Sequence, residues 1–472
     1  MSLLFLLIFL YFLSLRLLRW AAIWQQKEYR LDRLIAYLKT KEGSAELNRF
    51  ILFPLSKNQI KRPHFTSKMV LILVLTGCFL GTFNWGNIFS LAGMYLLIPL
   101  WLTISTIPTW IITYIIRLLT EKKAQALLSK ASPTIIGVSG SYGKTTTKIL
   151  IGELFKQQES TWVSPKSHNN PLSIAQAIVN TYTNQKYVIL EYAAYKKGEI
   201  KYLANKYPAS LAVFTGINEQ HLALFGNRKS MISAESELIE SLSKGSRLYF
   251  NDMDPTVSEI ARSFDSLMLI PASNCKLYKV KLAKSGYLEF SLTAKGSIIK
   301  TQLVGKHYLA NIQQSINVAR SFGISDISIS KTLKDFEPGD EFIRTQKTKQ
   351  GMTLIIDDRT SNPDGFKSAI DLISKMDAEH KLIVSSGIID LGTAENKVHT
   401  ELAKLMVGEV DQFLHTGETG KESLRSNLDD KYYSITNSAQ LKQHLHKSLG
   451  TKTLILIEGK IPQEIYNYLV SL

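Results

Sequence analysis

Residues 133–150 constrain the fold of this chain more than any other stretch. A short apolar run at 135–138 leads into the sequence Gly140-Ser-Tyr-Gly-Lys-Thr-Thr, and helix-forming residues follow. An apolar run, a glycine-rich turn and a helical segment predict a strand, a loop and a helix in that order. In such a unit the loop N–H groups and the positive end of the helix dipole surround a phosphate. The stretch therefore predicts a phosphate-binding loop.

The residue types in this loop suit a nucleoside triphosphate bound with Mg²⁺. Glycines let backbone N–H groups turn toward phosphate oxygens, Lys144 can bridge the β- and γ-phosphates, and the Thr145 hydroxyl can hold Mg²⁺. A full consensus would have glycine at position 138, where this chain has valine, so a glycine turn with a surface lysine is the alternative interpretation. The expected nucleotide-binding residues here are Gly140, Ser141, Gly143, Lys144, Thr145 and Thr146.

Three apolar stretches before residue 120 indicate membrane-spanning helices at about 2–24, 68–86 and 88–116. A spanning helix needs about 20 mostly apolar residues. The first stretch, interrupted only by Arg16 and Arg19, and the third are long enough, whereas the second reaches this length only if residues 84–86 lie at the interface. Pro99 and Pro108 predict kinks in the third stretch. The alternative is that these stretches are buried helices of a soluble domain.

The chain has a net charge of +16, and the distribution of this charge along the sequence indicates which kind of partner it has. Nucleic acid and an anionic membrane surface both attract such a chain. Residues 25–68 carry ten Lys and Arg against four Asp and Glu, and this basic block lies between two apolar stretches. We therefore expect a lipid bilayer as partner and no nucleic acid. A helix at 31–38 within the block is either interfacial or packed on another domain.

The same charges predict an orientation. Cytoplasmic loops are rich in Lys and Arg. The loop 25–67, together with Arg117, Lys122 and Lys123 after the third stretch, is therefore expected in the cytoplasm. This makes the chain a multi-pass protein of the plasma membrane, with its N-terminus outside and everything after about residue 120 in the cytoplasm.

After residue 120, strand-like and helix-like segments alternate, which is typical of α/β folds with parallel sheets. The expected strands of the first sheet, after 135–138, are 161–163, 187–191, 211–215 and 247–251, and 277–303 reads as antiparallel strands. The alternation resumes at 353, with strands at 354–357, 381–385, 412–415 and 454–457 and helices at 365–376 and 397–407. We therefore predict three domains: a membrane region at 1–120, a nucleotide-binding domain at 121–335 and a smaller α/β domain at 336–472.

Further candidate residues follow the strands of the first sheet. Glu191 closes the strand 187–191, where a hard oxygen ligand for a metal ion would be needed. His221 follows the strand 211–215, although a single histidine is more often a hydrogen-bonding loop residue than a ligand. Glu235 and Glu237 lie on an expected helix, where acidic residues usually face solvent.

The ordered motifs closely resemble the Mur ligase family over about residues 133–472. They are the phosphate loop, His168-Asn-Asn-Pro-Leu-Ser, Glu191, Gly198-Glu-Ile-Lys-Tyr-Leu, His221-Leu-Ala-Leu-Phe-Gly, Asn251-Asp-Met-Asp, Gly305-Lys-His-Tyr-Leu-Ala-Asn and Asp357-Asp-Arg-Thr-Ser-Asn-Pro-Asp-Gly. The family includes ATP-dependent peptidoglycan ligases and folylpolyglutamate, cyanophycin and polyglutamate synthetases. The segments at 198–200, 221–226 and 392–399 look most like the branch that adds D-alanyl-D-alanine.

The resemblance implies a role for each matched residue, with ATP and Mg²⁺ as cofactors. Lys144 would contact the β- and γ-phosphates and act in catalysis. Thr145 and Glu191 would hold the magnesium ion of ATP, and His221 a second one near the substrate carboxylate. The remaining matches are Asn311 by the adenine, Asp358 by the ribose, Arg344 by the phosphates, and Asn169 and Asn170 on the acceptor side.

The implied reaction joins a carboxylate, on a cell-wall precursor or another acceptor, to an amino acid or dipeptide. ATP phosphorylates the carboxylate, and the amine attacks the resulting acyl phosphate. Many members carry a carbamate-modified lysine where this chain has Glu235, and a native carboxylate there supplies the same negative charge. Ile388 replaces an aspartate common in the D-alanyl-D-alanine branch, and the loop after Asn169 is short.

The N-terminal region departs most from the family pattern. Peptidoglycan ligases of the family resemble one another in a soluble first domain that binds a UDP-sugar, and here membrane segments take its place. The acceptor is then lipid-linked or polymeric, or the uridine site is lost. The alternatives are a polyglutamate-synthetase-like ligase and a nucleotide-binding scaffold without catalysis. A transport ATPase is disfavoured, because three membrane segments form no evident pathway.

Overall fold

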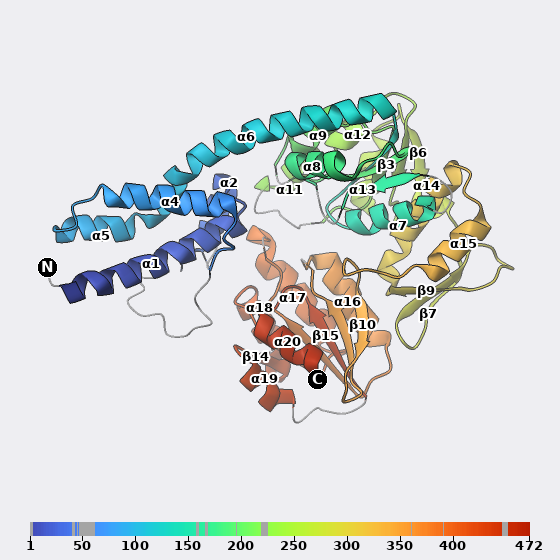
Figure 1. Ribbon diagram of the computed structural model, residues 1–472. Coiled ribbons are helices and arrows are strands. Elements are labelled where there is room, and N and C mark those ends of the chain that lie inside the picture. Colours follow the sequence, from blue (N-terminus) through green and yellow to red (C-terminus); the bar gives the residue numbers. More distant parts are fainter. Residues whose placement is uncertain are drawn as a thin grey trace. The chain divides into compact units, whose positions relative to one another are not determined.

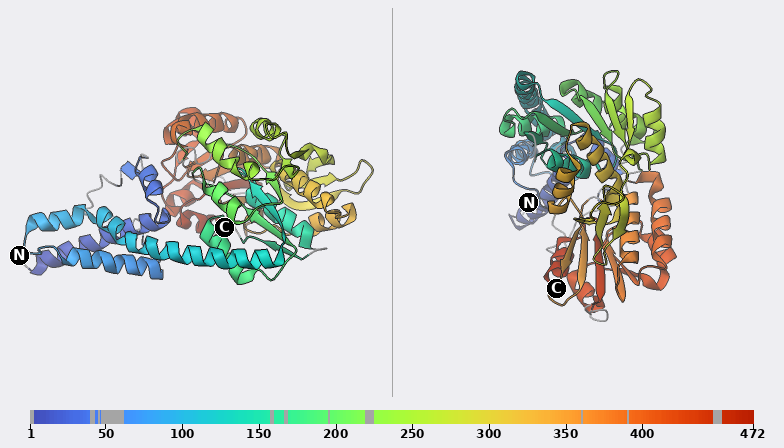
Figure 2. Two further views of the ribbon diagram at one scale, coloured as in Figure 1. Left: turned by 90° about the horizontal axis from the view of Figure 1, so that it is seen from above. Right: turned by 90° about the vertical axis from the view of Figure 1, so that its right-hand side faces the viewer.

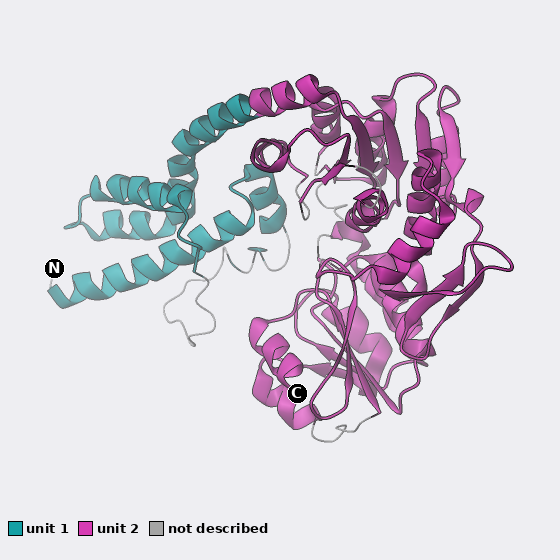
Figure 3. Cartoon of the chain, turned by 45° about the vertical axis from the view of Figure 1, so that its right-hand side comes forward, with its two compact units in different colours: residues 1–120 teal, residues 121–472 magenta. Residues whose placement is uncertain are grey.

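The computed structural model describes residues 3–39, 43–44, 46, 62–156, 160–165, 169–194, 196–218, 225–359, 361–389, 391–445 and 452–472. The chain forms two compact units, residues 1–120 and 121–472 (Figure 3). The boundary falls within one long helix, α6, which spans Ile98–Ala131. The part of α6 after residue 120 therefore belongs to unit 2.

Unit 1 is helical. Within the described residues its other helices are α1 (Leu3–Gln26), α2 (Leu31–Leu38), α4 (Ser67–Gly81) and α5 (Ile88–Leu96). Two helices, α1 and α6, are long and apolar enough to cross a membrane, whereas α4 has only 15 residues. The prediction of a single helix at 88–116 is wrong, because the helical structure is interrupted at Leu97, between α5 and α6. Pro99 lies in the first turn of α6, where its missing N–H has no helical partner to lose, so it need not kink the helix.

The charged residues of α1 are buried with partners in unit 1. Arg19 forms a two-point ion pair with Glu46, with 2.6 Å between Nη2 and Oε2. The Arg16 guanidinium lies 4.7 Å from the centre of the Tyr95 ring.

Unit 1 has a small core of buried apolar residues, to which α1, α2, α4, α5 and α6 contribute. Outside this core, large apolar side chains are exposed on α1, α4, α5 and α6, among them Leu3, Leu4, Val74, Phe89, Ile111, Ile115 and Leu119. Such an apolar surface is unusual for a protein in water.

The first sheet of unit 2 has six strands in the order β2-β3-β1-β4-β5-β6, and every pair is parallel. The strands are β1 (Thr134–Ser139), β2 (Thr161–Val163), β3 (Tyr187–Glu191), β4 (Leu211–Phe214), β5 (Arg247–Phe250) and β6 (Met268–Pro271). Alternate residues of each strand enter different cores, as Val188 and Ile189 do. The expected α/β fold with a parallel sheet is confirmed.

Helices cover both faces of this sheet (Figures 1 and 2). One core contains α8 (Pro171–Thr181), α9 (Glu199–Lys206), α11 (Arg228–Glu235), α12 (Glu237–Glu240), α13 (Pro255–Arg262) and the end of α6. The other contains α7 (Lys144–Lys156), α14 (Leu309–Ser321) and α15 (Asp326–Asp335). The antiparallel strands expected at 277–303 are confirmed as β7 (Tyr278–Leu282), β8 (Tyr287–Ser291) and β9 (Ile299–Val304).

The second sheet has the order β10-β11-β15-β12-β13-β14. Its strands are β10 (Arg344–Lys347), β11 (Thr353–Asp357), β12 (His380–Ser385), β13 (Gln412–His415), β14 (Tyr432–Ser434) and β15 (Thr453–Glu458). Only the edge strand β10 runs antiparallel to its neighbour, and this strand was not expected from the sequence. The helices are α16 (Pro363–Lys375), α17 (Glu395–Met406), α18 (Lys421–Leu428), α19 (Ser438–Leu445) and α20 (Gln463–Ser471), on both sides of the strands (Figure 2).

Candidate functional site

The predicted phosphate loop lies at the centre of the first sheet. It joins β1 to α7, and β1 is flanked by β3 on one side and β4 on the other. The chain therefore leaves β1 for one half of the sheet and later returns to build the other half. The carboxyl end of a strand at such a switch point is where open α/β sheets bind ligands.

Two glycines of the loop have backbone angles that side chains disfavour. Gly140 has φ +130° and Gly143 has φ +76°. A Cβ on Gly140 would lie 2.5 Å from Thr215 Oγ1, and one on Gly143 would lie 2.6 Å from Asn311 Nδ2. Both contacts are closer than real Cβ atoms make, so the loop conformation requires glycine at both positions.

In and around the phosphate loop, which contains Ser141 and Lys144, several buried hydroxyl groups have no hydrogen-bond partner in the described residues. The Lys144 ammonium donates to the carbonyl oxygens of Gly140 and Ser141, the latter at 3.0 Å. Within the described residues, the buried hydroxyls of Ser139, Ser141 and Ser164 have no hydrogen-bond partner. Because buried polar groups are nearly always paired, unpaired hydroxyls at the ends of β1 and β2 fit a site that takes a polar ligand. Thr146 is half-buried in the first turn of α7.

Glu191 joins the loop to the neighbouring strand. The Thr145 hydroxyl donates to Glu191 Oε2 at 2.8 Å, and Asn169 Nδ2 donates to Glu191 Oε1 at 3.3 Å. The structure therefore brings together three residues predicted from separate segments. Lys148, which the sequence reading missed, lies 3.0 Å from Glu191 Oε2 and is fully buried. Its only signal in the sequence is a position one helical turn after Lys144.

The oxygen atoms of Thr145 and Glu191 suit Mg²⁺. This ion is commonly held by one or two protein oxygens while nucleotide phosphates and water complete its shell. Within the described residues no group of three or more His, Cys, Asp or Glu side chains can hold a metal ion by itself. His221, expected to hold a second magnesium ion, lies outside the described residues.

Glu235 lies against the phosphate loop. The Gly140 N–H donates to Glu235 Oε2 at 3.2 Å, and only 4% of the residue is exposed. Burial raises the pKa of this carboxyl, while Lys144 and the Gly140 N–H act in the opposite direction. The expected solvated face at 235–237 is therefore wrong. Glu237 is also buried, and it accepts hydrogen bonds from the backbone N–H groups of Gly198 and Lys201 at the start of α9.

Two asparagines predicted as ligand contacts also have structural roles. Asn311 Nδ2 donates to Thr147 Oγ1 at 2.9 Å and to the Gly143 carbonyl at 3.3 Å, which fixes α14 beside the phosphate loop. Asn170 caps α8 by accepting the Ser173 N–H at 3.0 Å. Asn311 is therefore at the loop, and the Asn170 side chain is held at the helix terminus.

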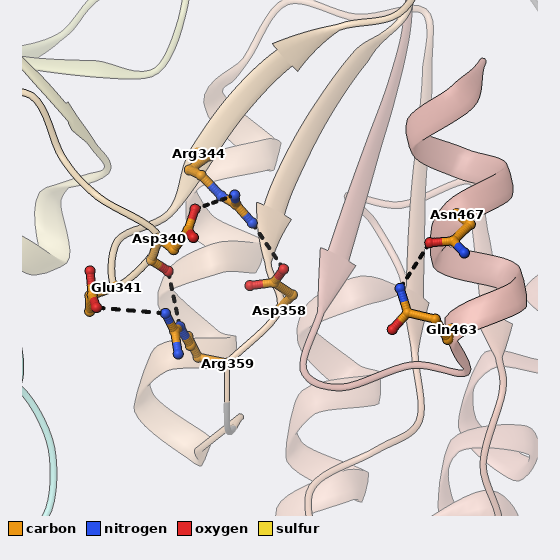
Figure 4. Close-up of polar contacts among 7 residues, drawn as sticks. All are labelled: Asp340, Glu341, Arg344, Asp358, Arg359, Gln463 and Asn467. Atoms are coloured by element: carbon orange, nitrogen blue, oxygen red, sulfur yellow. Dashed lines mark hydrogen bonds and ion pairs between the residues drawn. The ribbon is translucent and has the colours of Figure 1, made fainter. Parts of the chain in front are cut away.

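Arg344 and Asp358 lie together in the second α/β domain. Arg344 Nη2 is 2.9 Å from Asp358 Oδ2, and Nη1 is 2.6 Å from Asp340 Oδ1 (Figure 4). Arg344 starts the edge strand β10, and Asp358 directly follows β11. The structure thus pairs two residues for which different contacts were predicted, Arg344 with the phosphates and Asp358 with the ribose.

The second domain approaches the phosphate loop through the segment after β11. Asn218 Nδ2, beyond the end of β4, donates to Asn362 Oδ1 at 2.9 Å. Burial and the Asp254 charge raise the pKa of the Tyr142 phenol in the phosphate loop, and the Asp364 charge acts in the same direction. Tyr142 is anchored by its hydroxyl, which donates to Asp254 at 3.3 Å. Sequence spacing gave no signal for these contacts, because the partners lie more than 100 residues apart.

Comparison with protein families finds two matching domains. Residues 138–319 match the Mur ligase middle domain, and residues 341–461 match the Mur ligase, glutamate ligase domain. Together the two ranges make up well over half of the chain.

Named relatives are similar to this chain over much of its length. The chain is 24% identical over 346 residues to the UDP-N-acetylmuramoyl-tripeptide–D-alanyl-D-alanine ligase of Bacillus subtilis, covering 72% of this chain and 76% of the relative. It is 27% identical over 249 residues to the enzyme of the same name from Mycobacterium tuberculosis, covering 51% and 49% of the two chains.

Solved structures show the same fold. MurF from Acinetobacter baumannii superposes with a TM-score of 0.67 at 18% identity, covering 75% of this chain and 79% of the other. MurF ligase from Thermotoga maritima, in complex with ADP, gives a TM-score of 0.67 at 21% identity, covering 75% and 83%. With both family domains in sequence order and this fold around the phosphate loop, the chain belongs to the Mur ligase family.

Proposed function

We propose that this protein is a membrane-anchored ATP-dependent ligase that joins the carboxylate of an acceptor to the amine of an amino acid or dipeptide. The observation that carries the proposal is the meeting of Thr145, Asn169 and Glu191 beside a phosphate loop whose conformation requires Gly140 and Gly143. Membership of a family whose named relatives are ligases supports the same activity.

The reaction needs ATP because a carboxylate is a poor acyl donor. A carboxylate oxygen bonds to the γ-phosphorus, the bond between that phosphorus and the β,γ-bridging oxygen breaks, and ADP leaves. The amine nitrogen then bonds to the acyl carbon, the carbon–oxygen bond to phosphate breaks, and the amine loses a proton. The products are an amide, ADP and phosphate.

The chain's own residues assist by position and charge. The Lys144 ammonium would neutralise charge on the transferred phosphoryl group, and backbone N–H groups of the loop would orient the phosphates. Thr145 and Glu191 would hold Mg²⁺, which supplies Lewis-acid stabilisation of phosphate charge when bound. Arg344 and Asp358 would contact the phosphates and ribose, Asn311 the adenine, and Asn169 and Asn170 the acceptor side.

Glu235 would supply a permanent negative charge beside the loop, in place of a carbamate-modified lysine. A genetically encoded carboxylate needs no bicarbonate for its formation. The contact between Glu235 and the Gly140 N–H supports this role. The enzyme would therefore work without added bicarbonate.

The substrates we favour belong to peptidoglycan or cell-envelope biosynthesis. The relatives named for D-alanyl-D-alanine addition support a similar amine. The apolar surface of unit 1 and its two long apolar helices support a site at the membrane, with a lipid-linked or polymeric acceptor.

Phosphate release from ATP tests the activity. The detergent-solubilised full chain would be given Mg²⁺ and each of three acceptors: UDP-muramyl peptides, lipid-linked muramyl peptides and polyglutamate. Each acceptor is combined with D-alanyl-D-alanine, single amino acids or no amine. We expect release that requires one acceptor and one amine, with a product heavier by that amine.

The panel also separates the alternatives. Release that requires polyglutamate and glutamate would establish a polyglutamate-synthetase-like ligase. ATP binding without turnover on any pair would contradict the ligase proposal and favour a nucleotide-binding scaffold.

A further inference from the structure

A lysine ammonium group of unit 1 has a fixed position without a counter-charge. Lys68 lies in the first turn of α4, and its Nζ atom is 4.4 Å from the centre of the Tyr29 ring. The same atom donates to Thr113 Oγ1 of α6 at 3.4 Å. Lys68 is only partly exposed, and it forms no ion pair in the part of the chain that the structure describes. A partly buried cation without an anion is unfavourable unless a ligand supplies the opposite charge.

The acidic side chains of the unit are engaged elsewhere. Each one that the structure describes within residues 1–120 pairs with an arginine: Glu28 with Arg33 and Asp32 with Arg30, both at 2.7 Å, and Glu46 with Arg19. These pairs neutralise cations of α1 and α2 and leave the Lys68 ammonium uncompensated. One of its three N–H donors goes to Thr113, so donors remain for a ligand.

The Tyr29 ring beside Lys68 is held from several sides. Gln25 Nε2 donates to Tyr29 Oη at 3.2 Å and to the His64 carbonyl at 2.9 Å, and the His64 N–H donates to Gln25 Oε1 at 2.7 Å. Trp110 Nε1 of α6 donates to the Tyr29 carbonyl at 2.9 Å. Both Glu28 and Tyr29 have φ +56°, a left-handed conformation that is costly for residues with side chains. The surrounding bonds therefore hold the ring in one place, and the ammonium with it.

Further cations lie on aromatic rings at this end of the unit. Lys27 Nζ is 4.4 Å from the centre of the Tyr37 ring, and the Arg117 guanidinium is 5.2 Å from that of Tyr114. Arg117 follows Thr113 by four residues, so both lie on the same face of α6. Basic and aromatic side chains together are typical of the boundary between a bilayer and water, where they meet lipid headgroups.

Exposed apolar side chains adjoin these cations. Phe65, three residues before Lys68, is 63% exposed. Helix α2 buries Leu34 in the core of the unit but exposes Leu31 and Ile35. A free phosphate ion would leave this apolar surface in water, whereas a lipid covers it with acyl chains while its phosphate meets the cations. The surroundings of Lys68 therefore favour a lipid over a free anion.

We infer that Lys68, positioned by Tyr29 and Thr113, binds the phosphate group of a membrane lipid. The ammonium supplies charge-assisted hydrogen bonds to phosphate oxygens, and Lys27 and Arg117 add positive charge around it. Two sources share this chemistry: an anionic phospholipid of the bilayer, and the phosphate-bearing lipid of a lipid-linked acceptor. The inference rests on the membrane anchoring in the proposed function and assigns unit 1 a ligand site as well as an anchoring role.

Native mass spectrometry of the full chain in an uncharged detergent tests the site. Phosphatidylglycerol, undecaprenyl phosphate and phosphatidylcholine would be titrated separately, and the Kd of the first bound lipid compared. We expect the wild type to bind an anionic lipid at least about fivefold more tightly than phosphatidylcholine. The tighter of the two anionic lipids identifies the source. Lys68→Met should remove most of the preference, and Lys68→Arg, which keeps the charge, should retain it.

A matched control separates a site from general attraction. Lys39→Met removes the same charge from an exposed lysine of the same unit and should bind like the wild type. Lys68→Gln serves if Lys68→Met fails to fold. Equal wild-type binding of all three lipids, an unchanged preference in the uncharged Lys68 variant, or an equal loss in Lys39→Met would overturn the site. Displacement of the lipid by equimolar inorganic phosphate would overturn its assignment to a lipid. Carbonate extraction of membranes holding the same variants shows separately whether the proposed anchoring holds.

Discussion

At the scale of single residues, the phosphate loop is fixed from several directions. Thr215 Oγ1 donates to the Tyr142 carbonyl and, at 3.1 Å, to the Ser139 carbonyl. The Ser141 N–H donates to the Gly216 carbonyl at 2.6 Å. These bonds hold the loop in shape without using Lys144 as a structural anchor. The lysine is therefore the residue whose loss should affect chemistry more than folding.

Lys144→Ala should reduce ATP turnover by about 100-fold or more, because it removes the cation beside the transferred phosphoryl group. The thermal unfolding midpoint should change little, since the hydrogen bonds of Lys144 go to carbonyls of a loop that Thr215 and Gly216 also hold. Phosphate release and scanning fluorimetry measure the two effects. Lys156→Ala, at the exposed end of the same helix, is the control. Near-wild-type turnover in Lys144→Ala would refute the proposed nucleotide site.

Glu235 gives a prediction about bicarbonate. The wild type should turn over ATP at the same rate with and without bicarbonate, because its anion is encoded. Glu235→Lys should be weakly active in bicarbonate-free buffer and should recover when bicarbonate allows the lysine to form a carbamate. Phosphate release under both conditions is the measurement. Full activity of Glu235→Lys without bicarbonate would show that the carboxylate has no role at the site.

At the scale of elements, the buried residue Glu237 caps the N-terminus of helix α9. Helix α9 begins after Gly198, which has no side chain to cap the free N–H groups. Glu237 accepts from Gly198 N at 2.6 Å and Lys201 N at 2.9 Å, so α12 supplies the cap from another part of the chain. A carboxylate at a helix N-terminus also interacts favourably with the helix dipole.

Glu237→Gln should therefore destabilise unit 2, by about 1 kcal/mol or more, because a buried charge-assisted cap is replaced by a neutral amide. The expected result is a lower thermal unfolding midpoint of the full chain in detergent. Glu240→Gln, three residues later and exposed, should leave the midpoint unchanged. If Glu237→Gln and Glu240→Gln have the same thermal unfolding midpoint, Glu237 does not stabilise α9 as a cap.

At the scale of the whole molecule, unit 1 differs from unit 2 in what it exposes. Unit 2 buries its apolar side chains in cores on both faces of two sheets. Unit 1 has one small core and exposes large apolar side chains along α1, α4, α5 and α6. A lipid bilayer would cover that surface at little cost.

We expect the full chain to stay with membranes after alkaline carbonate extraction and to have its N-terminus outside. In a Cys78→Ser background, Ser2→Cys should react with a membrane-impermeant maleimide on intact cells. Ser243→Cys, exposed in unit 2, should react only after permeabilisation. Release by carbonate would contradict membrane insertion, and labelling of Ser243→Cys on intact cells would contradict the orientation.

Features that depend on local order along the chain can be predicted from the residues alone. Glycines and a lysine between an apolar run and a helix specify the phosphate loop, and alternating segments specify α/β domains, since backbone preference and periodicity are local properties. The local pattern gave a wrong prediction at residues 88–116, where one helix was expected. The continuous apolar pattern does not show that the chain forms two helices, α5 and α6, which are separated at Leu97.

Which side chains contact one another depends on how the elements pack in three dimensions. Lys148 beside Glu191 and Glu235 beside Gly140 are contacts between residues far apart in the sequence. The register of parallel strands and the burial of each partner set these contacts. Neither quantity is encoded in the spacing of residues along the chain, because crossover helices separate the strands that lie side by side.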